Sequence, residues 1–255
     1  MGTDHDGMTY AEYLHLDRVL DAQYPRAEPE EHDELMFIIH HQVTELWFKL
    51  LLHEVAATRT AFRADAADWA ALSRAARVLT HMNDQWRVLD TLTPEAFHRF
   101  RHALGSASGL FSVQYRALEY LLGKRHPGWN AVAATDADQP SVFDEFLRFL
   151  HRRGHPVPDR YLHRDWRDRR DTGPQLDRVL ERICARGGDE RLLCEELAAI
   201  DGLLREWRLR HLQLVERLLG GSPGTGGTAG VGYLKMTVDD LHFPELARFT
   251  CDPNA

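Results

Sequence analysis

Hydrophobic residues recur at three- and four-residue steps over long stretches of the chain, which is the pattern of amphipathic α-helices. The clearest stretch covers residues 30–63, about nine helical turns without an internal proline or glycine. Its apolar positions are Leu35, Ile38, Ile39, Leu46, Leu50, Leu51 and Val55. A second long stretch covers residues 190–219 and ends at Gly220-Gly221, a typical C-terminal stop. Shorter helices are expected at residues 67–92, 108–122, 141–153 and 174–186.

Strand signals are nearly absent, because no alternating β-branched runs are joined by Asn-Gly or Asp-Gly turns. Residues 124–140 and 154–173 are richer in Gly, Pro, Asp and Arg, so we expect connecting loops and short helices there. The sequence shows no internal repeat and no shift of composition. It therefore predicts an all-α fold, a bundle of long helices with short decorating helices, in a single domain over residues 1–255.

Composition narrows the class of protein. The chain has 255 residues, of which 44% are hydrophobic, so it can bury a sizeable core and is not disordered. The net charge of −8 gives no attraction to nucleic acid or to an anionic membrane. Three widely spaced cysteines exclude a disulfide scaffold and fit a reducing compartment. The polar start lacks a signal peptide and no apolar run is long enough to span a membrane, so we expect a cytoplasmic protein.

One face of the first long helix combines aromatic residues with a histidine. Phe37, His41, Thr44 and Phe48 stand at i, i+4, i+7 and i+11. A histidine among aromatics can hydrogen-bond a ligand that stacks on them, but a core histidine satisfied by a carbonyl gives the same spacing. His40 points about a quarter-turn away and is expected to be partly solvated.

A second histidine, His211, lies on the apolar stripe of the other long helix, which its neighbours Leu203, Trp207, Leu214, Val215 and Leu218 define. A neutral imidazole in an apolar pocket is what a proximal haem ligand requires. A satisfied core histidine again fits the spacing equally well.

Two further segments have ligand-binding character. Residues 224–230 read Gly-Thr-Gly-Gly-Thr-Ala-Gly and follow a helix without a Gly-Lys-Ser/Thr sequence, which disfavours a phosphate loop. They predict either a loop that closes over a ligand, with Thr225 as a hydroxyl donor, or a flexible linker. Arg101 shares a helix face with Phe97 and Leu104, which suits a bidentate carboxylate clamp, although a surface arginine remains the alternative.

A di-iron bundle is the rival metal hypothesis. It needs two Glu-x-x-His pairs and two further inward glutamates. The chain offers Glu12-x-x-His15 and Glu95-x-x-His98, but neither pair lies in the two long helices. Near the start, Tyr10, Tyr13 and Leu14 are expected to pack either into a cleft of this chain or into that of another one.

Taken together, eight motifs in order resemble the tryptophan 2,3-dioxygenase family, haem enzymes of the cytosol, over residues 9–249. They are Thr9-Tyr10-x-x-Tyr13-Leu14, His32-Asp33-Glu34, Phe37-Ile38-Ile39-x-His41-Gln42 with Glu45-Leu46-Trp47, Gln85-Trp86-x-x-Leu89 with Leu92-Thr93-Pro94, Phe97-x-x-Phe100-Arg101-x-x-Leu104, Ser108-Gly109 with Gln114-Tyr115-Arg116, Trp207-Arg208-x-x-His211 and Gly224-Thr225-Gly226-Gly227. The 14-residue spacing from His211 to Thr225 fits as well. The pattern departs from the family at Phe97, Leu110, Phe111 and Ala229.

The resemblance implies an active site with haem b, active as Fe2+, and O2 as co-substrate. His211 would be the proximal iron ligand, with Trp207 beside the cofactor, and His41 would accept a hydrogen bond from the substrate's indole N–H. The rest of the substrate site would be formed by Phe37, Phe97, Arg101, Leu104, Ser108, Gly109 and Thr225, with Arg101 at the carboxylate and Thr225 at the ammonium group. Tyr10, Tyr13 and Leu14 would enter a neighbouring active site of a homotetramer.

The implied reaction is cleavage of the indole C2–C3 bond of L-tryptophan to N-formylkynurenine, the first step of the kynurenine pathway. Some relatives in antibiotic pathways act on β-substituted tryptophans such as β-methyltryptophan and insert one oxygen atom. That mono-oxygenase activity stays open as the alternative, and a di-iron or cofactor-free bundle is the remote one.

Overall fold

The computed structural model describes residues 7–125, 138–220 and 230–247. Every regular element in these ranges is helical, which confirms the all-α prediction. In chain order the helices are α1 (Tyr10–Leu14), α2 (Leu16–Val19), α3 (His32–Arg63), α4 (Trp69–Leu89), α5 (Pro94–Phe100), the 3-10 turns η1 (Arg101–Leu104) and η2 (Gly109–Phe111), α6 (Val113–Leu122), α7 (Val142–Arg152), α8 (Asp159–Leu162), α9 (Pro174–Arg186), α10 (Asp189–Leu219), α11 (Val231–Val238) and α12 (Pro244–Ala247).

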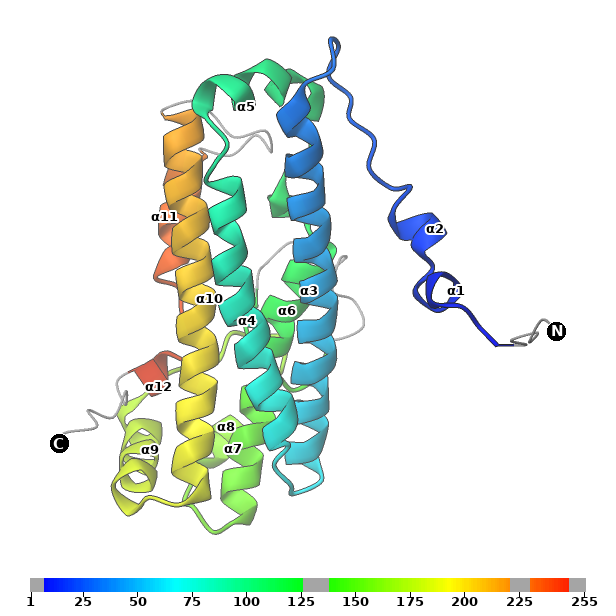
Figure 1. Ribbon diagram of the computed structural model, residues 1–255. Helices are drawn as coiled ribbons and strands as arrows, with labels where there is room; N and C mark the ends of the chain where they lie inside the picture. The colour runs from blue at the N-terminus through cyan, green and yellow to red at the C-terminus, as the bar shows by residue number, and fades with distance from the viewer. Residues whose placement is uncertain (1–6, 126–137, 221–229, 248–255) are drawn as a thin grey trace.

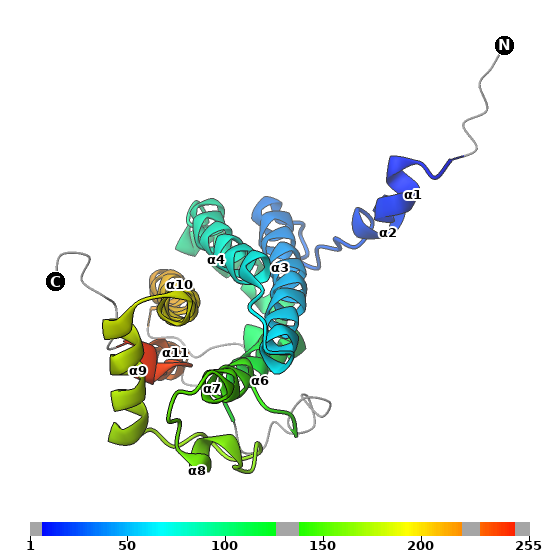
Figure 2. The same ribbon diagram turned by 90° about the horizontal axis from the view of Figure 1, so that it is seen from below.

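Three long helices form the frame of the bundle. Helix α4 packs along both α3 and α10, so it lies between the two helices on which the sequence places its candidate histidines (Figure 1). Helices α6 and α7 pack on α3, whereas α9, α11 and α12 pack on α10. Viewed along the long helices, α3, α4 and α10 form one side of the bundle, and α6, α7, α9 and α11 lie on the other side (Figure 2).

The ends of the helices follow from local sequence. Asp68 caps α4 by accepting from the backbone N–H of Ala71. Thr93 caps α5, whose first residue is Pro94, a residue suited to that position because it lacks an N–H. Gly123 ends α6 in the left-handed conformation with φ of 111°, which costs glycine little.

The helix expected over residues 108–122 is shorter than the periodicity predicts. The structure has the turn η2, then a break at Ser112, and α6 begins only at Val113. The reason is local, because the Ser112 hydroxyl accepts from the N–H of Tyr115 and starts a new helix. Ser108 likewise accepts from the N–H of Leu110 at 3.3 Å.

The lower half of the bundle holds a dense aromatic core. The ring of Phe62 at the end of α3 lies 5.3 Å from that of Phe146 and 5.4 Å from that of Phe149, both on α7. All three side chains are almost completely buried. Burial of such apolar rings contributes the largest favourable free energy to folding, so this aromatic core holds the lower ends of the long helices together. The cavity described below lies in the upper half of the bundle.

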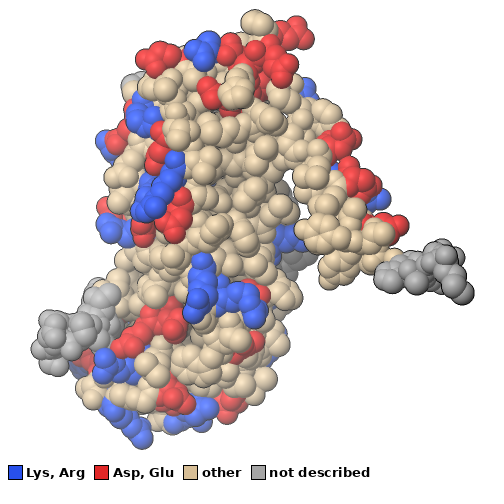
Figure 3. All heavy atoms as spheres, in the orientation of Figure 1, with Lys and Arg blue, Asp and Glu red and all other residues tan. Residues whose placement is uncertain are grey.

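The N-terminal arm, residues 7–24, projects from the bundle and carries exposed apolar side chains, although Gln42 of α3 hydrogen-bonds to Ala22 and Gln23 near the base of the arm. Tyr10 is 76% exposed, Tyr13 72% and Leu14 38%, and neither α1 nor α2 has a buried residue. Figure 3 shows the arm projecting from the body, whose face in this view carries interspersed charges of both signs. None of the helices in the described ranges combines the length and hydropathy that a membrane crossing requires.

Candidate functional site

A cavity opens in the upper half of the bundle, where α3, α4, α6, α10 and α11 meet the segment before α6. Its wall is mainly apolar and aromatic, with a small number of polar groups, as is usual for small-molecule sites. Of the thirteen residues that the resemblance assigns to the site, eight line the cavity, and these are Phe37, His41, Phe97, Leu104, Ser108, Gly109, Trp207 and His211. The fold therefore brings together residues that lie up to 174 positions apart along the chain, from Phe37 to His211.

The wall from α3 carries the aromatic face that periodicity predicts. Phe37, His41, Thr44 and Phe48 all line the cavity. The rings of Phe37 and His41 lie 4.2 Å apart, and the Nδ1 of His41 is 2.7 Å from the carbonyl oxygen of Phe37. Since a carbonyl only accepts, that nitrogen carries the proton and Nε2 keeps its lone pair. Burial lowers the pKa of His41, although the Phe37 carbonyl and Glu45 oppose the shift, so the ring is neutral at pH 7.

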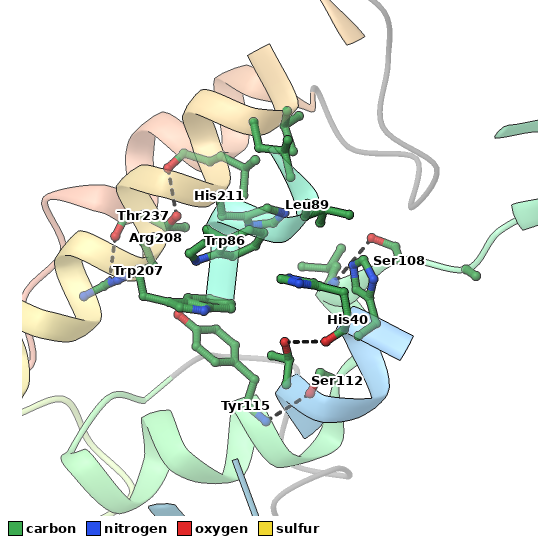
Figure 4. Close-up of a pocket in the computed structure, with 18 of the residues that line it drawn as sticks. His40, Trp86, Leu89, Ser108, Ser112, Tyr115, Trp207, Arg208, His211 and Thr237 are labelled. Carbon is green, nitrogen blue, oxygen red and sulfur yellow. Dashed lines mark hydrogen bonds between the residues drawn. The ribbon is translucent and has the colours of Figure 1, made fainter. Parts of the chain in front are cut away.

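The opposite wall is formed by α10, which presents His211. The His211 ring stacks on Trp86 of α4, with centroids 5.6 Å apart and planes 13° apart, and lies 5.9 Å from the Trp207 ring. Burial, together with the charge His41 would carry if protonated, lowers the pKa of His211 to about 4. His211 is therefore a neutral imidazole in an aromatic setting (Figure 4).

His40 is not partly solvated, as its position a quarter-turn from His41 predicted. It is 7% exposed and its ring lies 4.9 Å from that of Trp86. The reason is that α4 packs against this side of α3 and covers the position. Burial, followed by the proximity of His41 and His211, lowers the pKa of His40 to about 4.

The third wall comes from residues 97–112. Phe97 is buried with its ring 5.9 Å from Phe37, and Leu104 packs against the hydrophobic core. Ser108 and Gly109 border the cavity where the chain turns toward α6. Because this wall is apolar on the Phe97 side and polar at Ser108, the cavity is suited to an aromatic ring with a polar end.

The remaining side of the cavity, toward α6 and α11, is lined by charged and hydroxyl-bearing residues. Arg116 pairs with Glu119 and donates to the hydroxyl of Tyr233 at 3.2 Å. Arg208 donates through Nη1 to the carbonyls of Thr237 at 2.7 Å and Asp240 at 2.8 Å. Its Nη2, like the ring N–H of Trp86 and that of Trp207, is buried without a hydrogen-bond partner in the described part of the chain. Three donors thus remain for a ligand rich in acceptors.

Several predicted site residues lie elsewhere. Arg101 is in η1, one turn before Leu104, and is not part of the cavity wall. The arm residues Tyr10, Tyr13 and Leu14 are exposed, away from the cavity, and Thr225 lies outside the described residues. Sequence reasoning assigned no role to Trp86 and Arg208, although both stand inside motifs that it had noted.

The two Glu-x-x-His pairs do not meet. Glu12 and His15 lie in the arm, and Glu95 and His98 lie in α5, so both pairs are outside the cavity wall. The described residues contain no group of three or more His, Cys, Asp or Glu side chains arranged to hold a metal ion. The polar groups on the cavity wall are imidazoles, N–H donors, hydroxyls and the carboxylates of Glu45 and Glu119, which suits a cofactor pocket better than a carboxylate metal centre.

Comparison with known proteins gives the family. The family model described as tryptophan 2,3-dioxygenase matches residues 2–166 and 184–250. The chain belongs to the tryptophan 2,3-dioxygenase family. This confirms the resemblance that the eight motifs indicate, and the interior gap in the match, residues 167–183, comprises most of α9 and the residues just before it.

Curated tryptophan 2,3-dioxygenases resemble the chain over nearly its whole length. That of Myxococcus xanthus is 42% identical over 253 residues, which cover 93% of this chain and 87% of the relative. Those of Xanthomonas euvesicatoria and Xanthomonas campestris are 42% identical over 261 residues, covering 96% of this chain and 87% of each relative. The similarity therefore extends over nearly the whole chain and is not confined to one segment.

Proposed function

We propose that this chain is a haem-dependent dioxygenase that uses O2 to cleave the indole C2–C3 bond of L-tryptophan, forming N-formylkynurenine. Both oxygen atoms of O2 enter the product, so the reaction balances without another reductant. The observation that carries the proposal is the pair His41 and His211, two neutral imidazoles from α3 and α10 on the wall of one aromatic cavity. Family membership and the names of its relatives support it.

The residues of the cavity fit a haem group. His211 presents a neutral imidazole on the cavity wall, the form that an iron ligand requires, and its ring makes no hydrogen bond within the described part of the chain. The unpartnered N–H groups of Trp86, Trp207 and Arg208 match the carboxylate oxygens at the edge of haem. The aromatic wall suits its flat apolar face. Bound haem supplies the oxidising chemistry on O2, and the protein supplies position and electrostatics.

The indole ring is expected between Phe37, Phe97 and Leu104. This wall offers apolar contact on the side of the cavity where His41 presents Nε2. Because the proton of His41 is held at Nδ1 by the Phe37 carbonyl, Nε2 accepts a hydrogen bond from the indole N–H. His41 thereby orients the ring, and its lowered pKa makes it a weak base that does not remove the indole proton.

The amino acid end of the substrate is assigned by family resemblance. We assign its carboxylate to Arg101, which lies in η1 one turn before Leu104 of the cavity wall. We assign contact with the ammonium group to Thr225. We assign Ser108 and Gly109 to the part of the wall where the chain turns past the substrate. In a homotetramer, Tyr10, Tyr13 and Leu14 of a second copy would cover the site, and their exposure supports a docking role. Residues 1–255 act as one domain in this scheme.

Product analysis tests the proposed function. The purified protein is supplied with haem, a reductant that keeps the iron ferrous, oxygen-18 gas and either L-tryptophan or β-methyltryptophan. N-formylkynurenine carrying two heavy oxygen atoms is expected from L-tryptophan. A product with one heavy atom would show a mono-oxygenase instead, and turnover of β-methyltryptophan alone would show that the substrate is a β-substituted tryptophan. His211→Ala is the control, since loss of the Soret band and of turnover together identifies His211 as the haem ligand.

A further inference from the structure

The cavity wall contains two carboxylates that the proposed mechanism does not use, Glu45 of α3 and Glu119 of α6. The charge of Glu119 is compensated, because Arg116 pairs with it and the Nζ of Lys124 lies 3.9 Å from its other oxygen. Glu45 is half-buried and forms no ion pair with any of the described residues. Its negative charge is therefore left uncompensated on a largely apolar wall.

The Glu45 carboxylate is held in place by an amide. The Nε2 of Gln114, the second residue of α6, donates to the Oε2 of Glu45 at 2.9 Å and to its backbone carbonyl at 2.8 Å. An amide satisfies a carboxylate oxygen without cancelling its charge. A fixed charge in such surroundings acts strongly on its neighbours, because the effective dielectric constant of a protein interior is well below that of water.

The neighbour that matters is His41. Glu45 follows His41 by one turn of α3, so their side chains lie next to each other on the helix, and both line the cavity. Burial lowers the pKa of His41, and the charge of Glu45 opposes that shift, so the field of the carboxylate reaches the imidazole. The Nδ1 of His41 bonds to the Phe37 carbonyl instead of to Glu45, so the influence of Glu45 on the ring is electrostatic.

The proposed reaction creates positive charge at this point. When an oxygen atom bonds to C2 or C3 of the indole, electrons pass from the ring to the oxygen, and the ring nitrogen, conjugated with that double bond, takes up the positive charge. The N–H stays hydrogen-bonded to the Nε2 of His41, so the charge is shared between the indole and the imidazole. It disappears when the C2–C3 bond opens with both oxygen atoms in the product, so no proton, electron or further reactant is required.

We propose that Glu45 is the counter-charge for the cation that develops on the indole N–H and His41 during the reaction. The inference rests on the proposed function. Glu45 touches neither the indole nor its nitrogen in this scheme, so it is a positioning residue that acts through His41, and Gln114 keeps its carboxylate in place. An interaction with a charge that is absent from bound L-tryptophan raises kcat and leaves substrate affinity unchanged.

Neutralising Glu45 tests this role. Glu45→Gln keeps the size of the side chain and an oxygen that accepts from Gln114, but removes the charge. We expect kcat to fall about 10- to 100-fold, while the haem absorption spectrum is unchanged. The dissociation constant of L-tryptophan, measured by calorimetry without O2, should also stay as in the wild type. Glu45→Asp keeps the charge and should recover most of kcat. Glu206→Gln is the control, because Glu206 pairs with Arg210 on α10 and lies outside the cavity wall.

Substituted substrates report the charge itself. Fluorine at indole position 5 withdraws electrons and destabilises a cation on the ring, whereas a methyl group at this position donates electrons. Without its counter-charge the reaction depends more on the ring, so the ratio of kcat for 5-methyltryptophan to that for 5-fluorotryptophan should increase in Glu45→Gln. A residue that only supports the fold would lower both rates by the same factor.

The outcomes separate this inference from the proposed function. Wild-type kcat in Glu45→Gln, a Glu45→Asp protein as slow as Glu45→Gln, or weaker binding of L-tryptophan at unchanged kcat would each overturn the role of Glu45, while N-formylkynurenine formation by the wild type would still support the proposed function. If Glu45→Gln does not fold, Gln114→Leu leaves the charge but releases the carboxylate, and it must lower kcat without weakening L-tryptophan binding. A wild type that forms no N-formylkynurenine would overturn both proposals.

Discussion

Replacing His41 by alanine tests how the substrate is held. The variant removes an imidazole whose Nδ1 is 2.7 Å from the Phe37 carbonyl and whose ring packs 4.2 Å from that of Phe37. The stability of α3 itself changes little, because the Phe37 carbonyl lies within the helix and also takes part in its backbone hydrogen bonds. The substrate loses one hydrogen bond, and its indole N–H is left in an apolar slot. Such a loss costs about 1–3 kcal/mol, or roughly 10- to 100-fold in kcat/KM.

The assay compares L-tryptophan with 1-methyltryptophan, which has no indole N–H to donate. We expect His41→Ala to lose about 10- to 100-fold in kcat/KM with L-tryptophan while the absorption spectrum of the haem is retained. The variant should also reduce the preference for L-tryptophan, since the methyl group no longer meets the imidazole. His53→Ala is the control, because His53 is exposed on the same helix and lies outside the cavity wall, and it should behave as wild type. Complete loss of turnover with haem and tryptophan still bound would show essential proton chemistry at His41 and refute this reasoning.

Three other changes probe the remaining parts of the molecule. Arg101→Ala should raise the KM for L-tryptophan at least about tenfold with an intact haem spectrum, because it removes the proposed carboxylate partner; an unchanged KM would make Arg101 a surface residue. Deletion of residues 1–16 should lower activity far more than haem content, and a fully active monomer would contradict the docking role of the arm. Asp144→Asn should lower the free energy of unfolding by about 3 kcal/mol at pH 7, because it strands Arg164, which contacts Asp144 at 2.9 Å. Burial alone would raise the pKa of Asp144, but Arg164, Arg170 and Ser141 hold it below the usual 3.8, so the difference between variant and wild type in urea unfolding should shrink only as pH falls below 3.8.

Much of the fold follows from periodicity, because an apolar stripe must be buried whatever covers it. The stripe over residues 30–63 corresponds to α3, and that over residues 190–219 corresponds to α10, which begins one residue earlier. The break at Ser112 shows where this reasoning fails. A serine hydroxyl that accepts from the N–H of Tyr115 starts a new helix, and the hydrophobic pattern contains no sign of that competition.

The candidate site was predictable where residues share one helix. Spacing alone places Phe37, His41 and Thr44 on one face, and the structure places all three on the cavity wall. The environment of His40 was not predictable, because it is set by α4, which packs across the side of α3 that the pattern left exposed. The unpartnered Nη2 of Arg208 was not predictable either, because only the positions of the Thr237 and Asp240 carbonyls show which of its nitrogens lacks an acceptor.

The chemistry proposed for the cavity requires that His41 and His211 keep a fixed separation although they stand on different helices. Helix α4 provides this, because it is bonded to both neighbours. Arg74 donates hydrogen bonds to both carboxylate oxygens of Glu54 on α3, at 2.8 and 2.9 Å. Asn83 donates to the carbonyl of Leu203 on α10 at 3.1 Å.

A third bond of α4 lies at the site itself, where Gln85 donates to the hydroxyl of Thr44 at 2.7 Å. The Thr44 hydroxyl in turn donates a hydrogen bond to the carbonyl of His40 at 2.9 Å, so the chain of bonds runs from α4 to the backbone between the two adjacent histidines. Trp86, the next residue of α4, then contacts both His40 and His211. One turn of α4 therefore sets the register of α3 and the position of the stacked ring on α10. These contacts explain why Gln85 and Trp86 stand side by side on α4, although α4 contributes no imidazole to the cavity.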